Sequence, residues 1–546
     1  MTVGAETSET ATTTTTTRGT GGQAVVAALT AQGVEAVFGI PGVHTLAIYD
    51  ALREAPLRHI LARHEQGAGF MADGYARASG KPGVALVITG PGATNAATPL
   101  GEAFADSSPV LLVASGNEQG IAGRMVGDLH ELRDQTGLMR HLVAWGERAT
   151  SVTEVPLLIA EAFRQMGSGR PRPTYVEVPL DVLTGEGKFD PATGLCPPPT
   201  PPTPAAIAGA VAAIAAAERV IIFAGGGAVA AGADAALIAL AERLGAPVIT
   251  SQQGKGSIPE DHPLALGNQW ERGNAVDEAL QGADLAIVVG SKLWAGDAER
   301  CPVPMPGQIV RIDIDPAETE RHYAPVQAIV GDARLAVEAL VAALAAREIS
   351  KRGWSADEVT VIRERALAET WGADQAPYLA ALRRAIPRDG IVVNDMTMMS
   401  YLAARRFPVY GPRTFFSPTG YATLGFALPA AIGAKVARPD TTVVAVCGDG
   451  GFQYTMESLG VAVQHRIGLP VVIFNDSTYT AVKSAQAREQ ESRFFGVDLI
   501  NPDFVKLAGA YGIPGVRAES PEALTRAVVE AAGRDLPTII DVPIRF

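Results

Sequence analysis

A carboxylate stands among glycines directly after an apolar run in VVAVCGDGGF, residues 443–452. The apolar run predicts a buried strand, and the glycines predict a tight turn into a helix expected over about 452–467. The next apolar run, LPVVIF at 469–474, is followed after one residue by Asp476. In a right-handed βαβ unit the carboxyl ends of both strands meet at one edge of the sheet, so we expect Asp449 and Asp476 to be neighbours.

Two adjacent carboxylates suit a divalent cation that also carries phosphates. Without a cation they repel each other, and one of them should take up a proton. Mg²⁺ prefers one or two carboxylates and completes its octahedron with water and substrate phosphates, while glycine N–H groups attract the same phosphates. We therefore expect a metal and diphosphate site at Asp449 and Asp476, with phosphate contacts from Gly448, Gly450 and Gly451.

Other interpretations of this segment are weaker. A GDG tripeptide alone is also compatible with a plain strand-to-helix turn, and the second acid at 476 decides against that. The segment is not a Walker A loop, because no GK[ST] follows, and it is not a dinucleotide GxGxxG, because Gln453 occupies the position of the last glycine.

Composition excludes several classes of protein. A net charge of −13 without a Lys/Arg-rich segment argues against nucleic-acid binding. The chain has three cysteines without CxxC spacing, so neither a disulfide framework nor a zinc site is expected, and a reducing cytoplasm fits best. No run of 18 apolar residues predicts a membrane helix, and the Thr-rich residues 1–19 predict a disordered tail rather than a signal peptide.

The elements that must position the acidic site alternate between strands and helices. Near-continuous β-branched runs predict strands buried on both faces, which indicates parallel sheets covered by helices. The expected fold is α/β, with three doubly wound parallel-sheet domains. Proline and charge patterns place the boundaries as follows: a first domain at 20–185, a Pro-rich linker at 186–204, a central Rossmann-like domain at 205–345, a linker at 346–359 and a third domain at 360–546. The resemblance described below implies that the first of these is a pyrimidine-binding domain and the third a diphosphate-binding domain. The expected strands are VALVIT (84–89), PVLLVAS (109–115), TYVEVP (174–179), RVIIFAG (219–225), APVIT (246–250), LAIVVG (285–290), TVVAVCG (442–448) and LPVVIF (469–474).

The order GDG, helix, strand and N[ND] resembles that of thiamine diphosphate-dependent enzymes, in particular their acetolactate synthase-like, 2-oxo acid decarboxylase group. The resemblance extends over almost the whole chain after the tail. It implies a Mg²⁺ ion held by Asp449, Asp476 and the backbone carbonyl of Thr478. Asp at 476 replaces the commoner Asn of the family. The residues after the second acid that are assigned to the cofactor site are Tyr479, Thr480 and Ala481.

The most specific part of the resemblance is LARHEQGAGFMADGYARASGKPGVALVITGPGATN (61–95). It is similar to the family's pyrimidine-binding domain and implies that Glu65 contacts N1′ of the aminopyrimidine of the cofactor. The small and apolar residues 67–72 that follow should desolvate Glu65, raise its pKa and favour a carboxyl that donates to a ring nitrogen. A glutamate that merely stabilises a helix N-terminus is the alternative.

In PTGYATLGFALPAAIGA (418–434) the resemblance implies two further contacts. Leu424 matches the large apolar residue that bends the cofactor, and the carbonyl of Ala422 would accept from its 4′-amino group. Thr397 stands where the family binds phosphate.

In this family the two cofactor-binding domains come from different subunits, which implies a homodimer at least, with a tetramer common. The central segment VIIFAGGGAVAAG (220–232) fits GxGxxA at Gly225, Gly227 and Ala230, yet no acid follows the next strand to bind a ribose. We therefore favour a central domain without nucleotide, and FAD is the less favoured alternative.

The expected function is thiamine diphosphate- and Mg²⁺-dependent decarboxylation of a 2-oxo acid, followed by protonation to an aldehyde or ligation to a second carbonyl compound. His44 stands where benzaldehyde lyases have an active-site histidine, and His130 where many relatives have a glutamine; either could move protons near neutral pH. Acetolactate synthase proper, with FAD, and a catalytically inactive ligand-binding homologue are alternatives.

The substrate is open at this stage. The acids Asp128, Glu131 and Asp134 would suit a cationic substrate, and the sequence around them is similar to that of 5-guanidino-2-oxopentanoate decarboxylases. A solvated charged loop is the plainer interpretation of these acids. Lys483 could instead pair with a substrate carboxylate.

Overall fold

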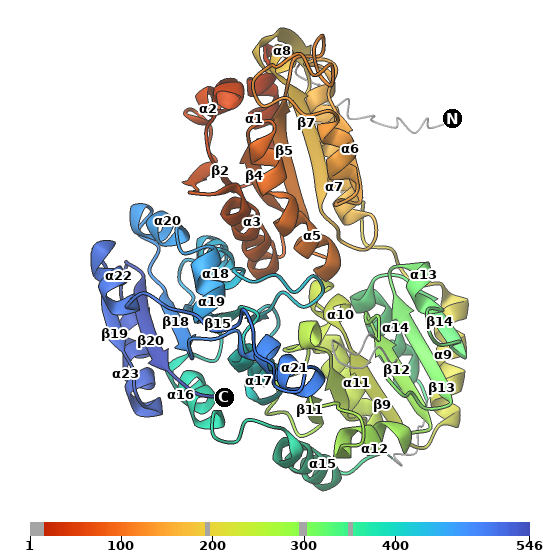
Figure 1. Ribbon diagram of the computed structural model, residues 1–546. Coiled ribbons are helices and arrows are strands. Elements are labelled where there is room, and N and C mark those ends of the chain that lie inside the picture. Colours follow the sequence, from red (N-terminus) through yellow and green to blue (C-terminus); the bar gives the residue numbers. More distant parts are fainter. Residues whose placement is uncertain (1–15, 192–196, 294–302, 348–352) are drawn as a thin grey trace, which may run out of the picture.

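The computed structural model describes residues 16–191, 197–293, 303–347 and 353–546. It contains three six-stranded sheets, each parallel throughout and covered by helices (Figure 1). The expected α/β class with three parallel sheets is thereby confirmed. Residues 1–15 of the expected tail, and also Cys196 and Cys301, lie outside the described residues. Within the described ranges, no helix is both long and apolar enough to cross a bilayer.

The first sheet lies at the top of Figure 1 and carries the segment that begins with Glu65. Its elements are α1 (Gly21–Ala31), β2 (Ala36–Gly39), η1 (Val43–Thr45), α2 (Leu46–Leu52), β3 (Arg58–Leu61), α3 (Glu65–Ser79), β4 (Gly83–Val87), α4 (Pro91–Asn95), α5 (Ala97–Asp106), β5 (Val110–Gly116), α6 (Gln135–Arg140), β6 (Trp145–Arg148), α7 (Glu154–Gly167), β7 (Thr174–Pro179) and α8 (Leu180–Thr184). The strand order is β3-β2-β4-β5-β7-β6. Strands β4, β5 and β7 are buried along their whole length, which is why their sequences are continuous apolar runs.

The central sheet follows the Pro-rich segment. Its elements are α9 (Pro204–Ala216), β9 (Val220–Ala224), α10 (Gly226–Ala230), α11 (Asp234–Leu244), β10 (Val248–Thr250), η2 (Gln252–Gly254), β11 (Ala265–Gly267), α12 (Ala275–Gln281), β12 (Leu285–Val289), β13 (Gln308–Asp313), α13 (Pro316–Thr319), β14 (Gln327–Val330) and α14 (Ala333–Ala345). The order is β11-β10-β9-β12-β13-β14. This sheet has its own hydrophobic core, separate from those of the other two sheets.

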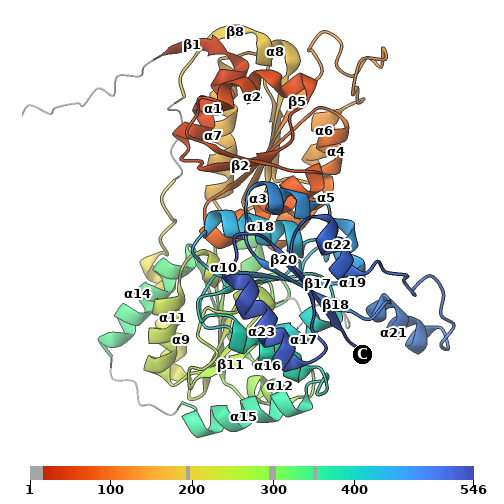
Figure 2. The same ribbon diagram turned by 90° about the vertical axis from the view of Figure 1, so that its left-hand side faces the viewer.

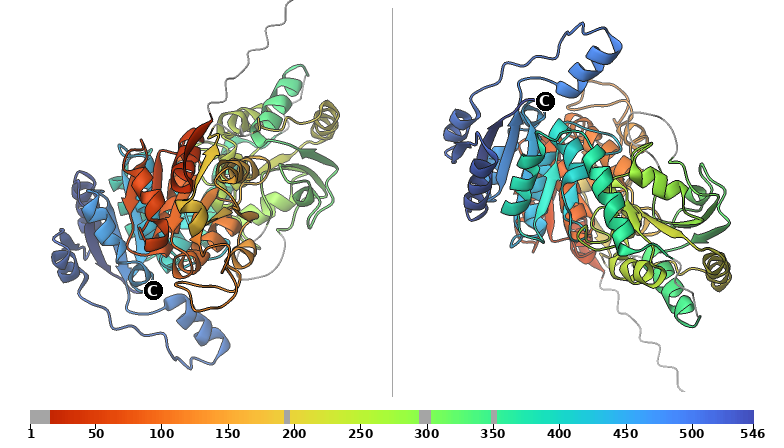
Figure 3. Two further views of the ribbon diagram at one scale, coloured as in Figure 1. Left: turned by 90° about the horizontal axis from the view of Figure 1, so that it is seen from above. Right: turned by 90° about the horizontal axis from the view of Figure 1, so that it is seen from below.

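The third sheet carries both acids of the expected metal site. Its elements are α15 (Ala356–Glu369), α16 (Ala376–Ala385), β15 (Ile391–Asn394), α17 (Met398–Arg406), β16 (Phe415–Phe416), α18 (Ala427–Ala437), β17 (Val443–Gly448), α19 (Asp449–Tyr454), α20 (Ser458–Gln464), β18 (Pro470–Asn475), α21 (Thr480–Glu489), α22 (Phe504–Ala510), β19 (Gly515–Arg517), α23 (Pro521–Ala532) and β20 (Thr538–Pro543). The order is β16-β15-β17-β18-β20-β19. Helix α21 has no buried residue and projects from the body of the molecule (Figures 2 and 3).

All eight strands expected from the sequence are present, but three other expectations differ from the structure. The helix expected over 452–467 is two helices, α19 and α20, because Thr455 turns its hydroxyl to the carbonyl of Gly425. The expected linker at 186–204 contains β8 (Glu186–Phe189), which pairs antiparallel with β1 (Thr17–Thr20) of the expected tail. In α15, Val359 and Ala366 pack into the central core, although we expected the third domain to begin at 360.

Helices α3 and α18 connect the first and third sheets, and their backbones are in direct contact. A Cβ added to Gly74 of α3 would lie 2.0 Å from the carbonyl oxygen of Ala430, and one added to Gly433 of α18 would lie 1.9 Å from that of Met71. Side chains larger than hydrogen cannot enter such a contact. Glycine at these positions therefore lets the two helices approach closely enough to share one core.

A buried ionic junction connects all three sheets beside this contact. Arg77 of α3 donates to Asp73 at 2.8 Å and to Asp106 of α5 at 3.1 Å. Asp106 also accepts from the backbone N–H of Thr419 at 3.1 Å and from Gln253 of the central sheet at 2.9 Å. Burying this arginine is tolerable only because two carboxylates satisfy it.

We predict that Gly433→Ala lowers the free energy of unfolding by about 1–3 kcal/mol, because the added methyl group meets backbone rather than a side chain that can move. Urea unfolding followed by circular dichroism measures the effect. Gly509→Ala is the matched control, since it also places a methyl group on a helix but meets nothing within 4 Å. Equal stability of the two variants would contradict the close approach of α3 and α18.

Candidate active site

The edge of the third sheet brings Asp449 and Asp476 together as the βαβ argument predicted. Strands β17 and β18 are parallel neighbours, with Gly448 opposite Phe474. The Asp449 carboxylate accepts from the backbone N–H of Ser477 at 2.8 Å, so it reaches the segment that directly follows Asp476.

Both carboxylates are held where a negative charge is unfavourable. Burial raises the pKa of Asp449, and the charge of Asp476 raises it further. Burial also raises the pKa of Asp476. Two partly desolvated acids that repel each other are stabilised by a bound cation, and their oxygen donors are those that Mg²⁺ prefers. The residues present thus fit a divalent cation.

The glycines of GDGG allow two other segments to approach the same edge. A Cβ added to Gly448 would lie 3.0 Å from the hydroxyl of Thr397. One added to Gly450 would lie 2.5 Å from the ring of Tyr479. Both Thr397 and Tyr479, which sequence comparison alone had placed in the site, therefore lie beside the GDGG turn.

The segment after Asp476 is folded back onto the same edge. Thr478 forms an isolated bridge with Asp498, and the hydroxyl of Thr480 donates to Asp476. Helix α21 then begins at Thr480, with Ala481 exposed on its first turn. Lys483 lies 2.6 Å from Asp498 and forms a solvent-exposed ion pair with it.

Glu65 is the first residue of α3, and His64 caps that helix by accepting from the N–H of Gln66. The Glu65 carboxylate accepts from Asn95 at 2.9 Å and is only half-buried. The apolar surroundings expected from the sequence begin at Gly67 and do not cover Glu65 itself. Within the described part of the chain, Glu65 shares no hydrogen bond with Asp449 or Asp476, so one chain does not join the two halves of the expected site through these groups.

The two candidate histidines, His44 and His130, are far apart in the sequence but neighbours in space. The rings of His44 and His130 lie 5.7 Å apart in an edge-to-face arrangement. His44 is buried, and its Nδ1 lies 3.0 Å from the hydroxyl of Thr89. Burial lowers the pKa of His44, and the charge of His130 lowers it further. Both effects favour the neutral imidazole of His44.

The acidic loop is less available than its sequence indicates. Glu131 accepts from the N–H of Gly127, and Asp134 caps α6. Asp128 accepts from Asn117 at 2.7 Å and still acts electrostatically on His44, as does Glu118. Asp128 and Glu118 are thus placed to meet a cationic group near the histidines.

Sequence reasoning missed the residues that hold segment 417–425, which carries Ala422 and Leu424. Ala422 has φ of 61°, a left-handed conformation that costs an alanine about 1–2 kcal/mol. Buried Asp395 accepts from the N–H of Gly425 at 3.0 Å, and Glu102 of α5 accepts from the N–H of Thr423 at 3.1 Å. No local pattern marks these acids, because Glu102 and Thr423 are 321 positions apart.

Asn501 was also missed, although it is polar and close to the acids. Its side-chain amide donates to Asp449 and to the side chain of Asn475 at 3.0 Å. It holds the Asp449 carboxylate in place from the loop that follows α21.

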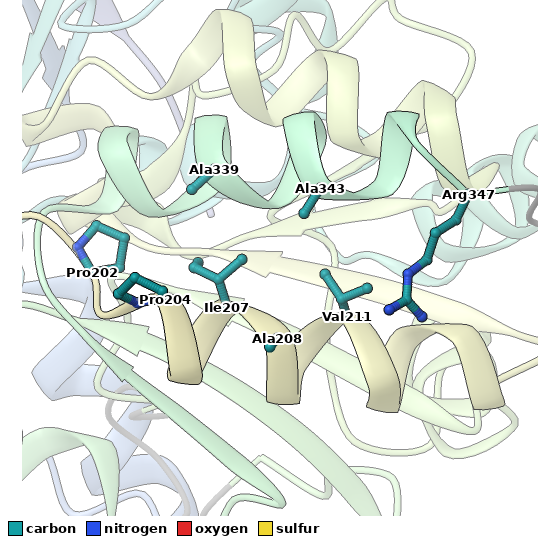
Figure 4. Close-up of a pocket in the computed structure, with 8 residues that line it drawn as sticks. All are labelled: Pro202, Pro204, Ile207, Ala208, Val211, Ala339, Ala343 and Arg347. Carbon is teal, nitrogen blue, oxygen red and sulfur yellow. The ribbon is translucent and has the colours of Figure 1, made fainter.

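In the central sheet the GxGxxA glycines have a packing role. A Cβ added to Gly225 would lie 2.2 Å from the carbonyl oxygen of Gly290, and one added to Gly227 would lie 2.7 Å from the Cα of Gly290. These glycines let the turn after β9 pack on the end of β12, with or without a nucleotide. An apolar groove of about 430 Å³ lies elsewhere in this unit, between α9 and α14 (Figure 4).

Three segments of the chain match family models of thiamine pyrophosphate enzymes. Residues 19–138 match the N-terminal TPP binding domain, residues 207–340 the central domain and residues 395–542 the C-terminal TPP binding domain.

Three relatives cover nearly the whole chain. The probable 2-ketoarginine decarboxylase AruI of Pseudomonas aeruginosa is 40% identical over 528 residues, covering 95% of this chain and 92% of the relative. The probable acetolactate synthase large subunit of Methanocaldococcus jannaschii is 35% identical, covering 95% and 91%. The acetolactate synthase isozyme 2 large subunit of Escherichia coli is 32% identical, covering 95% and 94%.

We predict that Mg²⁺ raises the Tm of the protein and that Asp449→Asn abolishes this effect. A ligand at 100 times its Kd stabilises a fold by about 2.7 kcal/mol, whereas the variant lacks one of the two acids. Without Mg²⁺ the variant should be at least as stable as the wild type at pH 7, because its amide removes a charge that burial disfavours.

Thermal melts with and without Mg²⁺ at low ionic strength measure both effects. Asp498→Asn is the control for the loss of one charge on the same domain, because Asp498 pairs with Lys483 rather than with the acids. A Mg²⁺ effect that persists in Asp449→Asn would overturn the metal assignment.

Proposed function

The chain belongs to the thiamine pyrophosphate enzyme family, and from that premise we propose that it decarboxylates a 2-oxo acid with thiamine diphosphate and Mg²⁺. The observation that carries the proposal is the pair of desolvated acids, Asp449 and Asp476, at one edge of the third sheet. The product is an aldehyde or, if a second carbonyl compound is bound, a ligated product. The division into a pyrimidine-binding, a central and a diphosphate-binding domain also belongs to this proposal, with the boundaries adjusted for β8 and α15 as described above.

The proposed roles follow from the geometry of this chain's residues. Asp449, Asp476 and the Thr478 carbonyl would hold Mg²⁺, which binds the diphosphate together with the N–H groups of GDGG. Thiamine diphosphate, when bound, supplies the carbon nucleophile and the electron sink for loss of CO₂. Glu65 would hold a proton at the aminopyrimidine nitrogen N1′. The remaining contacts proposed for the cofactor come from Thr397, Ala422, Leu424, Tyr479, Thr480 and Ala481.

We further propose that the site forms between two copies of the chain. Large apolar side chains are exposed on both halves of the site. Beside the histidines they are Val43, Leu46, Met125, Val126 and Leu129, and around α21 they are Val482, Phe494, Phe495 and Ile500. Apolar patches of this kind are typical of surfaces that a partner covers. A second copy would also desolvate the half-exposed Glu65.

A 2-oxo acid with a cationic tail is a favoured substrate. The support comes from Asp128 and Glu118 beside His44 and from the 40% identical relative, a probable 2-ketoarginine decarboxylase. Acetolactate synthesis is the second candidate, supported by the acetolactate synthase relatives. FAD in the central domain is tied to that candidate.

The test is release of CO₂ from pyruvate, a branched, an aromatic and a 5-guanidino 2-oxo acid by the protein supplemented with thiamine diphosphate and Mg²⁺. We expect the guanidino acid to give the highest kcat/KM. We expect Glu65→Ala to lower kcat/KM by at least ~100-fold, which is the lower end of the range for one general acid. Acetolactate from pyruvate, with flavin absorbance near ~450 nm, an ordinary property of a bound cofactor of this class, would favour the second candidate. No CO₂ from any acid would refute the proposal.

His44 gives a prediction of pH dependence. Burial and His130 lower the pKa of His44 below its ordinary value of 6.5, so its imidazole stays neutral until the pH falls through that lowered value. If neutral His44 takes part, kcat/KM should decline only below pH 6.5. His130→Asn removes a neighbouring positive charge, raises the pKa of His44 and should move the acid limb to higher pH.

A pH profile of kcat/KM for the wild type and His130→Asn measures this shift. His262→Asn is the control, because His262 lies in the central unit and contacts Glu242. An acid limb at the same pH in wild type and His130→Asn would show that neutral His44 does not control turnover.

A further inference from the structure

Segment 417–425 lies along helix α5 and is tied to it at three successive points. The Thr419 hydroxyl donates to Asp106 at 2.9 Å. The ring of Tyr421 would lie 3.0 Å from a Cβ added to Gly101, so it packs directly on the helix backbone. Thr423 donates its N–H to Glu102 at 3.1 Å and its hydroxyl to the same carboxylate oxygen.

Ala422 lies between the last two of these ties. It is exposed and has a left-handed backbone, which an alanine does not adopt without constraint. The Thr423 N–H belongs to the same peptide unit as the Ala422 carbonyl, so its bond to Glu102 orients that peptide unit. The direction of the Ala422 carbonyl is therefore set by α5.

Glu102 is an unusual group for a merely structural tie. It has no exposed surface, and one of its two carboxylate oxygens, Oε1, has no hydrogen-bond partner among the described residues. Burial raises the pKa of Glu102, and the charge of Asp106 adds to this effect. All of its hydrogen bonds within the described ranges go to Thr423.

We propose that Glu102 is a positioning residue which, through Thr423, holds Ala422 in its left-handed conformation and so directs the Ala422 carbonyl toward the 4′-amino group of bound thiamine diphosphate. The proposal rests on the proposed function, which assigns that cofactor to this edge. Glu102 itself does not touch the cofactor.

The test compares two ligands that differ at the 4′ position. Oxythiamine diphosphate carries an oxygen where thiamine diphosphate has the amino group, so it cannot donate to the Ala422 carbonyl. Calorimetric titration of the full chain with Mg²⁺ gives the Kd of each ligand. We expect Glu102→Ala to raise the Kd of thiamine diphosphate by ~10-fold, the size of one hydrogen bond to a well-placed acceptor. The Kd of oxythiamine diphosphate should rise by less than ~2-fold.

Further variants separate positioning from general damage. Glu102→Gln should restore the preference for the amino ligand, because its amide oxygen can still accept from Thr423. Thr423→Val removes the hydroxyl bond to Glu102 but keeps the N–H bond, so it should change the preference between the two ligands in the same direction as Glu102→Ala and by a smaller amount. Glu318→Ala is the matched control, since Glu318 is also a buried glutamate but lies in the central unit, where it pairs with Arg170 of the first unit. It should leave the ratio of the two Kd values unchanged.

Each outcome decides the matter. The positioning role is supported if the ratio of the Kd for oxythiamine diphosphate to the Kd for thiamine diphosphate falls in Glu102→Ala, falls less in Thr423→Val and is restored in Glu102→Gln. If Glu102→Ala raises both Kd values equally, or raises neither, the positioning role is wrong and Glu102 only connects two domains. Failure of the wild type to bind thiamine diphosphate at all would instead refute the proposed function.

Discussion

The backbone contact between α3 and α18 is the constraint on which the rest of the molecule depends. Gly74 and Gly433 allow two helices from different sheets to approach until backbone meets backbone, and the first and third sheets then share one core. The features between the first and third sheets depend on the relative position of these two helices. This position places α5 beside segment 417–425, and it sets the distance at which the ionic junction can close.

Ionisable groups whose charged form is unfavourable lie at the positions proposed for metal binding and proton transfer. Burial raises the pKa of both Asp449 and Asp476, and burial and a neighbouring charge lower that of His44. Each of these groups destabilises the isolated chain in its charged form. A bound cation, a diphosphate or a substrate removes part of that cost, so binding energy is stored in the fold before any ligand arrives.

The sequence predicted what depends on local pattern. Buried parallel strands such as β4 and β17 are continuous apolar runs, and the topology of one βαβ unit was enough to place Asp449 beside Asp476. Short strands such as β16, with two residues, leave no such run. The acids Glu102 and Asp395 could not be predicted, because their roles arise only when segments far apart in the chain meet.

The ionic junction at Asp106 has a consequence for the chain as a whole. Arg77 and Asp106 both lie on helices of the first sheet, whereas the segment after β16 and the central sheet supply neutral donors to Asp106. The three sheets resemble separable modules, yet an excised first sheet would lose these donors and expose its ion pair to water. We therefore expect the first sheet alone to be less stable than the same sheet in the full polypeptide, which makes truncation a poor route to a stable fragment.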